Sequence, residues 1–168
     1  MEFRLANMGD LKELKDMYKE IVKDMNDNNI QIWDDVYPCD FFENDIKNNQ
    51  MYILIDSNEI ISAFVLCNTN AGAEKVQWNK EFGKSIYLDR LGVNTKCCKK
   101  GIGTLMLEKA KKIAKSKGYD CLRLFVVDIN IPAVNLYVKN GFVKAQGIYD
   151  EIFDDGFVLH EYGFETEL

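Results

Sequence analysis

This chain of 168 residues has a single histidine, two prolines and no apolar run long enough to cross a membrane; residues 60–67 form one of the longest runs. Its five cysteines include no Cys-x-x-Cys pair, so with one histidine we expect no structural metal site. An odd cysteine count without a signal peptide's apolar core argues against a disulfide framework. We therefore expect a cytoplasmic protein with no membrane partner.

Basic residues are also fewer than acidic residues. The chain has 21 Lys and Arg residues against 27 Asp and Glu residues, for a formal net charge of −6. An acidic chain is repelled by phosphate backbones, so nucleic acid is not an expected partner. The length and the apolar fraction of 47% suit one globular domain over residues 1–168 with a buried core of its own.

Hydrophobic periodicity predicts an alternating α/β order. Asp10 is the expected N-cap of the first helix, and Gly92 suggests a bulge or a close backbone approach. The last two strands should form an antiparallel pair joined by an acidic loop, 150–156. The expected strands are 2–5, 51–55, 60–67, 86–93, 121–127, 142–149 and 157–164. The expected helices are 11–25, 41–46, 101–117 and 132–139. The unit from 86 to 127 should be a right-handed parallel crossover in a mixed sheet.

A lysine-bearing turn follows the strand that ends at Val93, and two glycines then open a long amphipathic helix. Free backbone N–H groups and the helix dipole favour an anion at a helix N-terminus, and glycine lets a pyrophosphate approach the backbone. Taken alone, Gly101-x-Gly103 fits an anion site or an ordinary helix start. The dinucleotide fingerprint lacks its third glycine, at Met106, and no Gly-Lys-Ser/Thr of a Walker A loop occurs. The adjacent Cys97 and Cys98 are either small apolar residues or redox-sensitive thiols of lowered pKa.

A second motif, Asn-x-x-Ala-x-x-Leu-Tyr-x-x-x-Gly-Phe, runs from Asn130 to Phe142. Here the chain resembles the GNAT superfamily of N-acetyltransferases, which use acetyl-coenzyme A and whose glycine loop reads Gln/Arg-x-x-Gly-x-Gly/Ala. Both motifs occur in the right order, and the element order matches from Glu2 to Phe164. The resemblance implies a mixed, mostly antiparallel central sheet with one parallel βαβ crossover and helices on both faces. Cys98 stands where the family has Gln or Arg.

The resemblance also implies residue roles. Tyr137 would be the general acid for the leaving thiolate, although a packed helix tyrosine is the alternative. Asp89 would be the general base, directly or through water, or else a solvated strand carboxylate; Glu161 and His160 are further candidates for the base. Asn130 would bond the pantetheine arm, cap its helix, or both. The expected cofactor-binding residues are Leu91, Gly92, Val93, Cys98, Lys99, Lys100, Gly101, Ile102, Gly103, Thr104, Asn130, Ala133 and Tyr137.

The acceptor site implied by the resemblance includes Trp33, Tyr37 and Tyr149. Nearby carboxylates are hypothesised to attract a cationic amine: Asp34, Asp35, Asp150, Glu151, Asp154 and Asp155. The leading expectation is transfer of an acetyl group from acetyl-CoA to a primary amine of a small molecule or peptide, by direct attack in a ternary complex. The alternatives are a non-catalytic acyl-CoA-binding sensor and a nucleotide-binding enzyme. Family members often pair through edge strands, so a homodimer is a further expectation.

Overall fold

The computed structural model describes residues 1–81 and 83–168, and these fold into two compact units. The first unit contains Met1–Leu66 and Arg90–Met106, and the second contains Cys67–Asp89 and Leu107–Leu168. Strand β4 (Ser85–Val93) and helix α3 (Ile102–Ser116) each have one end in either unit. A single domain over residues 1–168 stays a prediction. No helix in the described part of the chain is both long and apolar enough to span a membrane.

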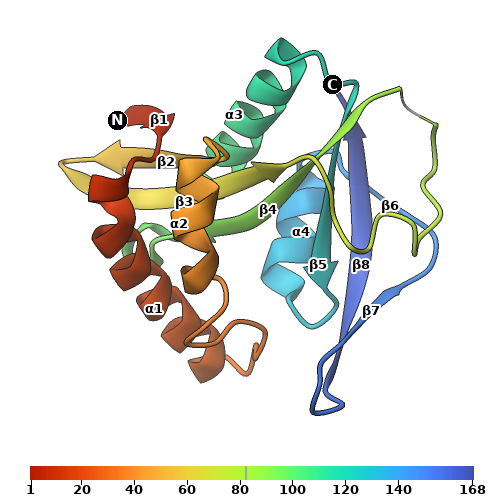
Figure 1. Ribbon diagram of the computed structural model, residues 1–168, viewed down its shortest axis with the longest axis horizontal. Helices are drawn as coiled ribbons and strands as arrows, with labels where there is room; N and C mark the ends of the chain where they lie inside the picture. The colour runs from red at the N-terminus through yellow and green to blue at the C-terminus, as the bar shows by residue number, and fades with distance from the viewer. Residues whose placement is uncertain (82) are drawn as a thin grey trace. The chain divides into compact units, whose positions relative to one another are not determined.

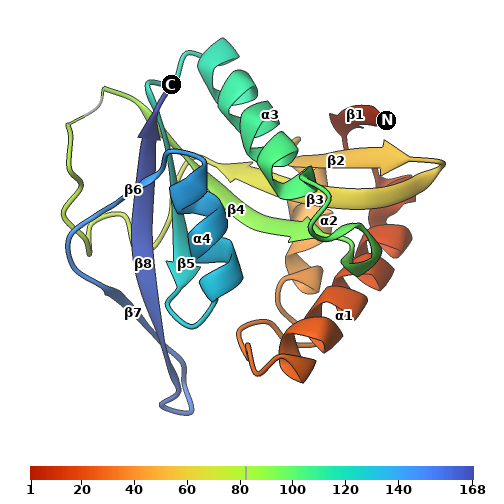
Figure 2. The same ribbon diagram turned by 180° about the vertical axis from the view of Figure 1, so that it is seen from behind.

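The first unit builds its core between two helices and three strands. Strands β1 (Glu2–Leu5), β2 (Met51–Asp56) and β3 (Glu59–Cys67) pair in that order, and β3 neighbours β4. Helices α1 (Leu11–Asp27) and α2 (Phe42–Lys47) lie on the same side of β2 and β3 in both views (Figures 1 and 2). Apolar side chains of α1 fall at the predicted helical spacing and are buried: Leu14, Met17, Tyr18, Ile21 and Val22.

Asp10 stands at the N-cap position of α1, as predicted, but its side chain makes no capping hydrogen bond to that helix. Asn7 instead caps a short 3-10 turn, Met8–Asp10, that leads into the helix, and its side chain accepts from the Gly9 N–H. The Asp10 carboxylate accepts from the Asn7 N–H at 2.7 Å and pairs with Arg4 at 2.7 Å. The two residues therefore form a reciprocal capping box, and Asp10 is its acidic member, at N3.

The second unit holds the parallel pair. Strand β4 runs parallel to β5 (Cys121–Val127) with Ile86 opposite Leu122, which confirms the predicted crossover. Strand β8 (Val158–Glu167) lies antiparallel along the whole of β5. Helix α4 (Ile131–Lys139) lies beside β5 and β8 in both views (Figures 1 and 2). The mixed fold is thus mostly antiparallel with one parallel pair, as predicted.

The end of the chain differs from the prediction. Strand β6 is only Val143–Lys144, and a separate strand β7, Tyr149–Ile152, pairs with Val158–Glu161 of β8. The loop is therefore 153–157, not 150–156. Cross-strand pairs explain the longer hairpin, because Asp150 bonds His160 at 2.7 Å and Glu151 shares a hydrogen bond with Glu161.

Candidate functional site

The glycine loop lies in the first unit and joins β4 to α3. Asn94 stabilises its start, since the side-chain oxygen accepts from the Lys96 N–H at 3.0 Å. A turn over 98–101 follows, in which Lys99 has φ 61° and Gly101 has φ 80°. The first helical bond of α3 runs from the Leu105 N–H to the Gly101 carbonyl at 3.0 Å, so the preceding N–H groups lie outside the helical ladder.

This loop fits an anion such as a pyrophosphate. A Cβ built on Gly101 would have no described atom within 4 Å, so the backbone is open on that side. Lys99 and Lys100 are exposed and place positive charge beside the helix N-terminus. Gly101 also has the left-handed conformation that an L side chain rarely adopts, which explains why this position takes glycine.

Cys98 is not a thiol of lowered pKa. Although the residue is exposed, burial of its thiol raises the pKa, and Asp24 and Cys97 raise it further against the opposing charge of Lys99. The Sγ atom donates to the Asn94 carbonyl oxygen at 3.7 Å. The interpretation of Cys98 as a small side chain that packs within the loop therefore agrees with the structure better than a redox-sensitive thiol does.

The end of β4 is fixed by a buried tyrosine of α1. The Tyr18 ring lies where a side chain of residue 92 would be, because a Cβ on Gly92 would stand 2.7 Å from Tyr18 Cζ. This is the close backbone approach that the sequence predicted at Gly92. The Gly92 carbonyl accepts from the Ser62 hydroxyl at 2.6 Å, so the backbone beside Leu91 and Val93 is held in one conformation.

An aromatic cluster in the first unit contains two of the predicted acceptor residues. Trp33 packs on Tyr18 with ring centroids 5.6 Å apart, and Tyr37 lies 6.5 Å from Trp33. The guanidinium of Arg90 lies 5.5 Å from the Tyr37 ring centroid and forms a buried ion pair with Asp45 at 3.7 Å. Sequence reasoning missed this ion pair, because Asp45 and Arg90 are far apart in the chain.

Asp34 has a local structural role instead of an open carboxylate. One of its oxygens accepts from the backbone N–H groups of Val36 and Tyr37 at 2.8 and 2.7 Å. This Asx-type turn shapes the segment that carries Trp33 and Tyr37. Two predicted acidic residues of the second unit also have local partners, since Asp150 bonds His160 and Asp155 accepts from the Phe157 N–H.

Tyr137 lies buried in the second unit. Its helix, α4, is capped by Asn130, whose side-chain oxygen accepts a hydrogen bond from the Ala133 N–H at 3.3 Å. The Tyr137 ring packs against Phe142 and Phe164, with centroids 5.8 and 6.3 Å away. Burial, and then the charge of Asp89, raise the pKa of Tyr137 well above its usual range. The phenol is therefore a protonated hydrogen-bond donor at neutral pH.

Three carboxylates interact in the same unit: Asp89, Glu151 and Glu161. Glu161 of β8 lies opposite Tyr149 of β7 in the strand register. Burial, a hydrogen bond with Glu151, and the charges of Glu151 and Asp89 raise the pKa of Glu161 to about 8. Such a carboxyl group exchanges its proton close to neutral pH, which is the property of a general base or acid. The sequence named Glu161 only as a further candidate, because its partner Glu151 was placed in a loop.

Tyr149 and His160 lie on the same two strands as Glu151 and Glu161. Tyr149 is half-buried, with its ring 5.9 Å from that of Phe125. Burial and then the nearby Glu151 and Glu161 raise the pKa of Tyr149. The hydrogen bond that the Asp150 carboxylate accepts from Nδ1 of the exposed His160 raises the pKa of this histidine and links it to the opposite strand.

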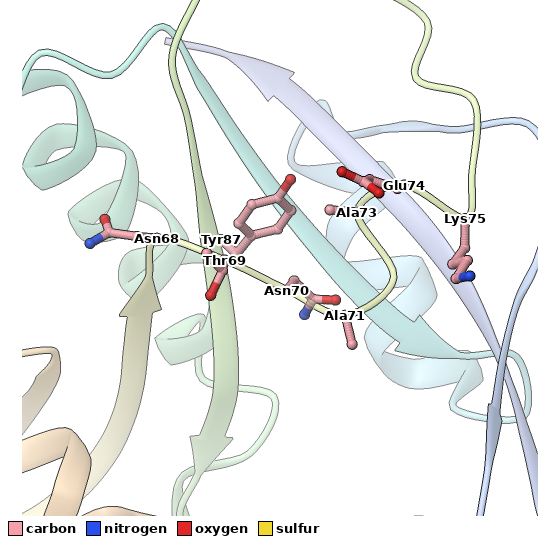
Figure 3. A pocket seen from close by; sticks show the side chains of 8 residues that line it. All are labelled: Asn68, Thr69, Asn70, Ala71, Ala73, Glu74, Lys75 and Tyr87. Carbon is pink, nitrogen blue, oxygen red and sulfur yellow. The ribbon is translucent and has the colours of Figure 1, made fainter.

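A pocket of about 340 Å³ lies in the second unit between the segment after β3 and strand β4. Figure 3 shows the Tyr87 ring between Asn68 and Thr69 at one end of this segment and Glu74 at the other. Asn70, Ala71, Ala73 and Lys75 complete the lining. The segment packs tightly on the aromatic pair, because a Cβ on Gly72 would lie 2.7 Å from Phe125 and 2.8 Å from Tyr149. No motif in the sequence indicated this pocket.

Comparisons with known proteins agree with one another. The acetyltransferase (GNAT) family model matches residues 14–142. The Bacillus subtilis (strain 168) protein YwnH, which is named for phosphinothricin acetyltransferase activity, is 26% identical over 150 residues, covering 86% of this chain and 85% of YwnH. The thialysine N-epsilon-acetyltransferase of Mus musculus is 40% identical over 66 residues, which cover 39% of this chain and 37% of the length of the mouse enzyme. Arabidopsis thaliana NAA60, solved with a bisubstrate analogue, has the same fold, with a TM-score of 0.71 and 20% identity over 99% of this chain and 97% of that one.

Proposed function

Because this chain belongs to the acetyltransferase (GNAT) family, we propose that it transfers the acetyl group of acetyl-CoA to a primary amine. The amine would attack the thioester directly while both substrates are bound. The observation that carries this proposal is the buried, protonated phenol of Tyr137, coupled to the carboxylate of Asp89. Glu161, a carboxyl group with a pKa of about 8, interacts with the same Asp89.

The residues that would hold acetyl-CoA follow from the loop geometry and the family motifs. Acetyl-CoA supplies the activated acetyl group as a thioester. The turn and first helical residues would hold the pyrophosphate through backbone N–H groups and lysine charge: Cys98, Lys99, Lys100, Gly101, Ile102, Gly103 and Thr104. Backbone groups at Leu91, Gly92 and Val93 would bond the pantetheine arm, and an N–H near Val93 would stabilise the developing oxyanion. Asn130 and Ala133 would contact the same arm at the start of α4.

Tyr137 would donate a hydrogen bond from its hydroxyl group to the departing sulfur, which leaves as the thiolate. Its raised pKa keeps the donor protonated at every pH at which the enzyme would work. The same raised pKa makes the phenol a weak acid, so its main contribution would be a hydrogen bond that strengthens as negative charge grows on sulfur. Burial supports this role, because hydrogen bonds are electrostatically stronger away from water.

Glu161 would take the proton from the acceptor amine, with Asp89 adjusting its affinity for that proton. An alkylammonium group has a pKa of about 10.4 and must lose a proton before attack. A base with a pKa of about 8 is matched to this task better than an ordinary carboxylate, which binds protons only in acid. Asp89 remains a second candidate, because its charge influences both Tyr137 and Glu161.

Trp33, Tyr37 and Tyr149 would contact the acceptor. Their aromatic rings suit the apolar stem of an amine, and the carboxylates beside Tyr149 suit its positive charge. The name of one relative, thialysine N-epsilon-acetyltransferase, specifies transfer to a nitrogen, which supports a nitrogen acceptor in this chain.

The test is substitution of Tyr137 by phenylalanine. Tyr137→Phe should lower kcat for thiol release from acetyl-CoA by about 100-fold or more, while CoA binding measured by calorimetry changes by less than about twofold. Tyr119→Phe, which removes an exposed hydroxyl in the same unit, is the matched control and should keep full turnover. Unchanged turnover in Tyr137→Phe would remove this residue from the mechanism. Tight CoA binding without transfer to any amine would point to a non-catalytic acyl-CoA sensor.

A further inference from the structure

The tip of the β7–β8 hairpin displays apolar side chains to solvent. Ile152 is 71% exposed, Phe153 is 42% exposed and Phe157 is 53% exposed. The two phenyl rings pack on each other, with centroids 5.9 Å apart. We call these three residues the hairpin tip. Clustered exposed apolar side chains on a soluble domain mark a surface that another molecule covers.

Hydrogen bonds hold this tip in a defined turn. The Phe153 N–H donates to the Phe157 carbonyl, and the Gly156 N–H donates to the Phe153 carbonyl, each at 2.9 Å. The Asp155 carboxylate accepts from the Phe157 N–H at 2.9 Å. The turn therefore presents its rings in a fixed arrangement, which lowers the conformational entropy lost when a partner binds.

The charge around the tip selects the partner. Between Tyr149 and Phe157 the chain carries Asp150, Glu151, Asp154 and Asp155, and no Lys or Arg. A second copy of this chain would bring the same negative charges, and nucleic acid or an anionic lipid surface would also be repelled. The surface that complements apolar rings among carboxylates is a cationic polypeptide that also carries apolar side chains.

The same hairpin carries the proposed base, Glu161, and one proposed acceptor contact, Tyr149. Glu161 and Tyr149 lie opposite each other near its base, and Phe153 follows Tyr149 by four residues. At a rise of roughly 3.3 Å per residue, this separation is about 13 Å along the strand. A small amine is too short to contact both places, whereas an extended peptide of about four residues spans them.

We propose that the acceptor is a basic polypeptide segment that docks on the hairpin tip while its amine reaches the carboxylates at the base of the hairpin. This inference rests on the proposed acetyl transfer for the reacting end of the acceptor, and adds the acceptor's class. Apolar side chains of the segment would pack on the paired rings of Phe153 and Phe157. Its cationic side chains would pair with Asp154 and Asp155.

Three acceptors separate this proposal from a small-molecule preference. The first is an N-acetylated peptide with one lysine and, about four residues away, a leucine between two arginines. The second has glutamates in place of the arginines, and the third is the small amine N-acetyl-lysine amide. The basic peptide should have a KM at least about 10-fold below that of the small amine, and the acidic peptide should lose this advantage. Equal KM values for all three would overturn the docking proposal while leaving acetyl transfer standing.

Variants of the tip test the surface itself. Phe153→Ser with Phe157→Ser should raise the KM of the basic peptide by about 5-fold or more and leave that of the small amine unchanged. Separately, Asp154→Asn with Asp155→Asn should raise the KM of the basic peptide by a similar factor. Val143→Ser, which removes an exposed apolar side chain outside the hairpin, is the matched control. Anisotropy of the fluorescein-labelled basic peptide reports binding independently of turnover. Peptide binding that both tip variants leave unchanged would overturn the proposal, whereas tip-dependent binding without any acetylation would sustain docking and overturn the proposed function.

Discussion

The hydroxyl of Tyr18 on α1 donates a hydrogen bond to the backbone carbonyl oxygen of Arg90, the residue at which β4 adopts a left-handed φ of 52°. The same hydroxyl bonds the Ala63 carbonyl of β3 at 3.3 Å. One buried phenol therefore fixes the bend of β4 to both a neighbouring strand and a helix. The Tyr18 ring therefore packs against the backbone at Gly92, which is the part of β4 that would contact the cofactor.

Gly92→Ala should destabilise the protein by about 1–3 kcal/mol, because its methyl group would stand 2.7 Å from the Tyr18 ring. Urea unfolding followed by fluorescence measures the change. Gly163→Ala is the matched control, since its methyl group would lie 3.1 Å from the nearest atoms, and it should cost less. Equal stability of Gly92→Ala and the wild-type chain would contradict this account of the strand end.

The acceptor step should depend on pH through Glu161. As pH rises through about 8, Glu161 loses its proton and becomes able to accept one, so kcat/KM for the acceptor should increase across that range. Glu151→Gln removes a charge that raises this pKa, so the rising limb should move to lower pH. Glu81→Gln, at an exposed site, should leave the profile in place. If kcat/KM instead rises only near pH 10, in the wild-type chain and in Glu151→Gln alike, the profile reflects deprotonation of the acceptor amine and not of Glu161.

Two glycines with the same backbone conformation separate the effect of charge from that of backbone strain: Gly101 in the glycine loop before α3, and Gly118 just after the end of α3. Gly101 and Gly118 have φ values of 80° and 78°, and a Cβ on either meets no described atom within 4 Å. An aspartate at either position should cost stability of about 1–2 kcal/mol from the left-handed backbone. Only Gly101→Asp adds negative charge at the N-terminus of α3, so it alone should abolish CoA binding in calorimetry. Loss of binding in both variants would assign the effect to strain.

The Cys98 thiol should react slowly. Its pKa is raised above the ordinary value, so at pH 7 the reactive thiolate is scarcer than in free cysteine. Iodoacetamide labelling followed by peptide mass spectrometry should show Cys98 modified more slowly than free cysteine in the same solution. Faster labelling than free cysteine would restore the redox-sensitive interpretation.

Much of the fold was predictable because its signals are local. The 3.6-residue spacing of Leu14, Tyr18 and Ile21 marks α1, and Gly118 ends α3 as expected. The β7–β8 hairpin was misplaced because Asp150 and Glu151 look like loop residues in isolation. Only their partners on the opposite strand, about ten residues later, make that segment a strand.

The features of the candidate site also differ in whether the sequence could predict them. The glycine loop and the capping role of Asn130 depend on near neighbours, and the sequence predicted both places. The ion pair of Asp45 with Arg90 and the raised pKa of Glu161 arise from residues distant in the chain. Burial and neighbouring charge determine such properties, and neither is encoded in a short motif.

Both compact units are discontinuous in the chain, and this limits how the protein can be divided. The chain passes between the units after residues 66, 89 and 106. No single cut therefore releases either unit whole, and a truncation that removes one would leave the other without part of β4 or α3. Reconstitution from two fragments divided between the units would have to restore a severed strand or helix, so split-protein and domain-exchange designs should place their junctions in exposed turns between complete elements.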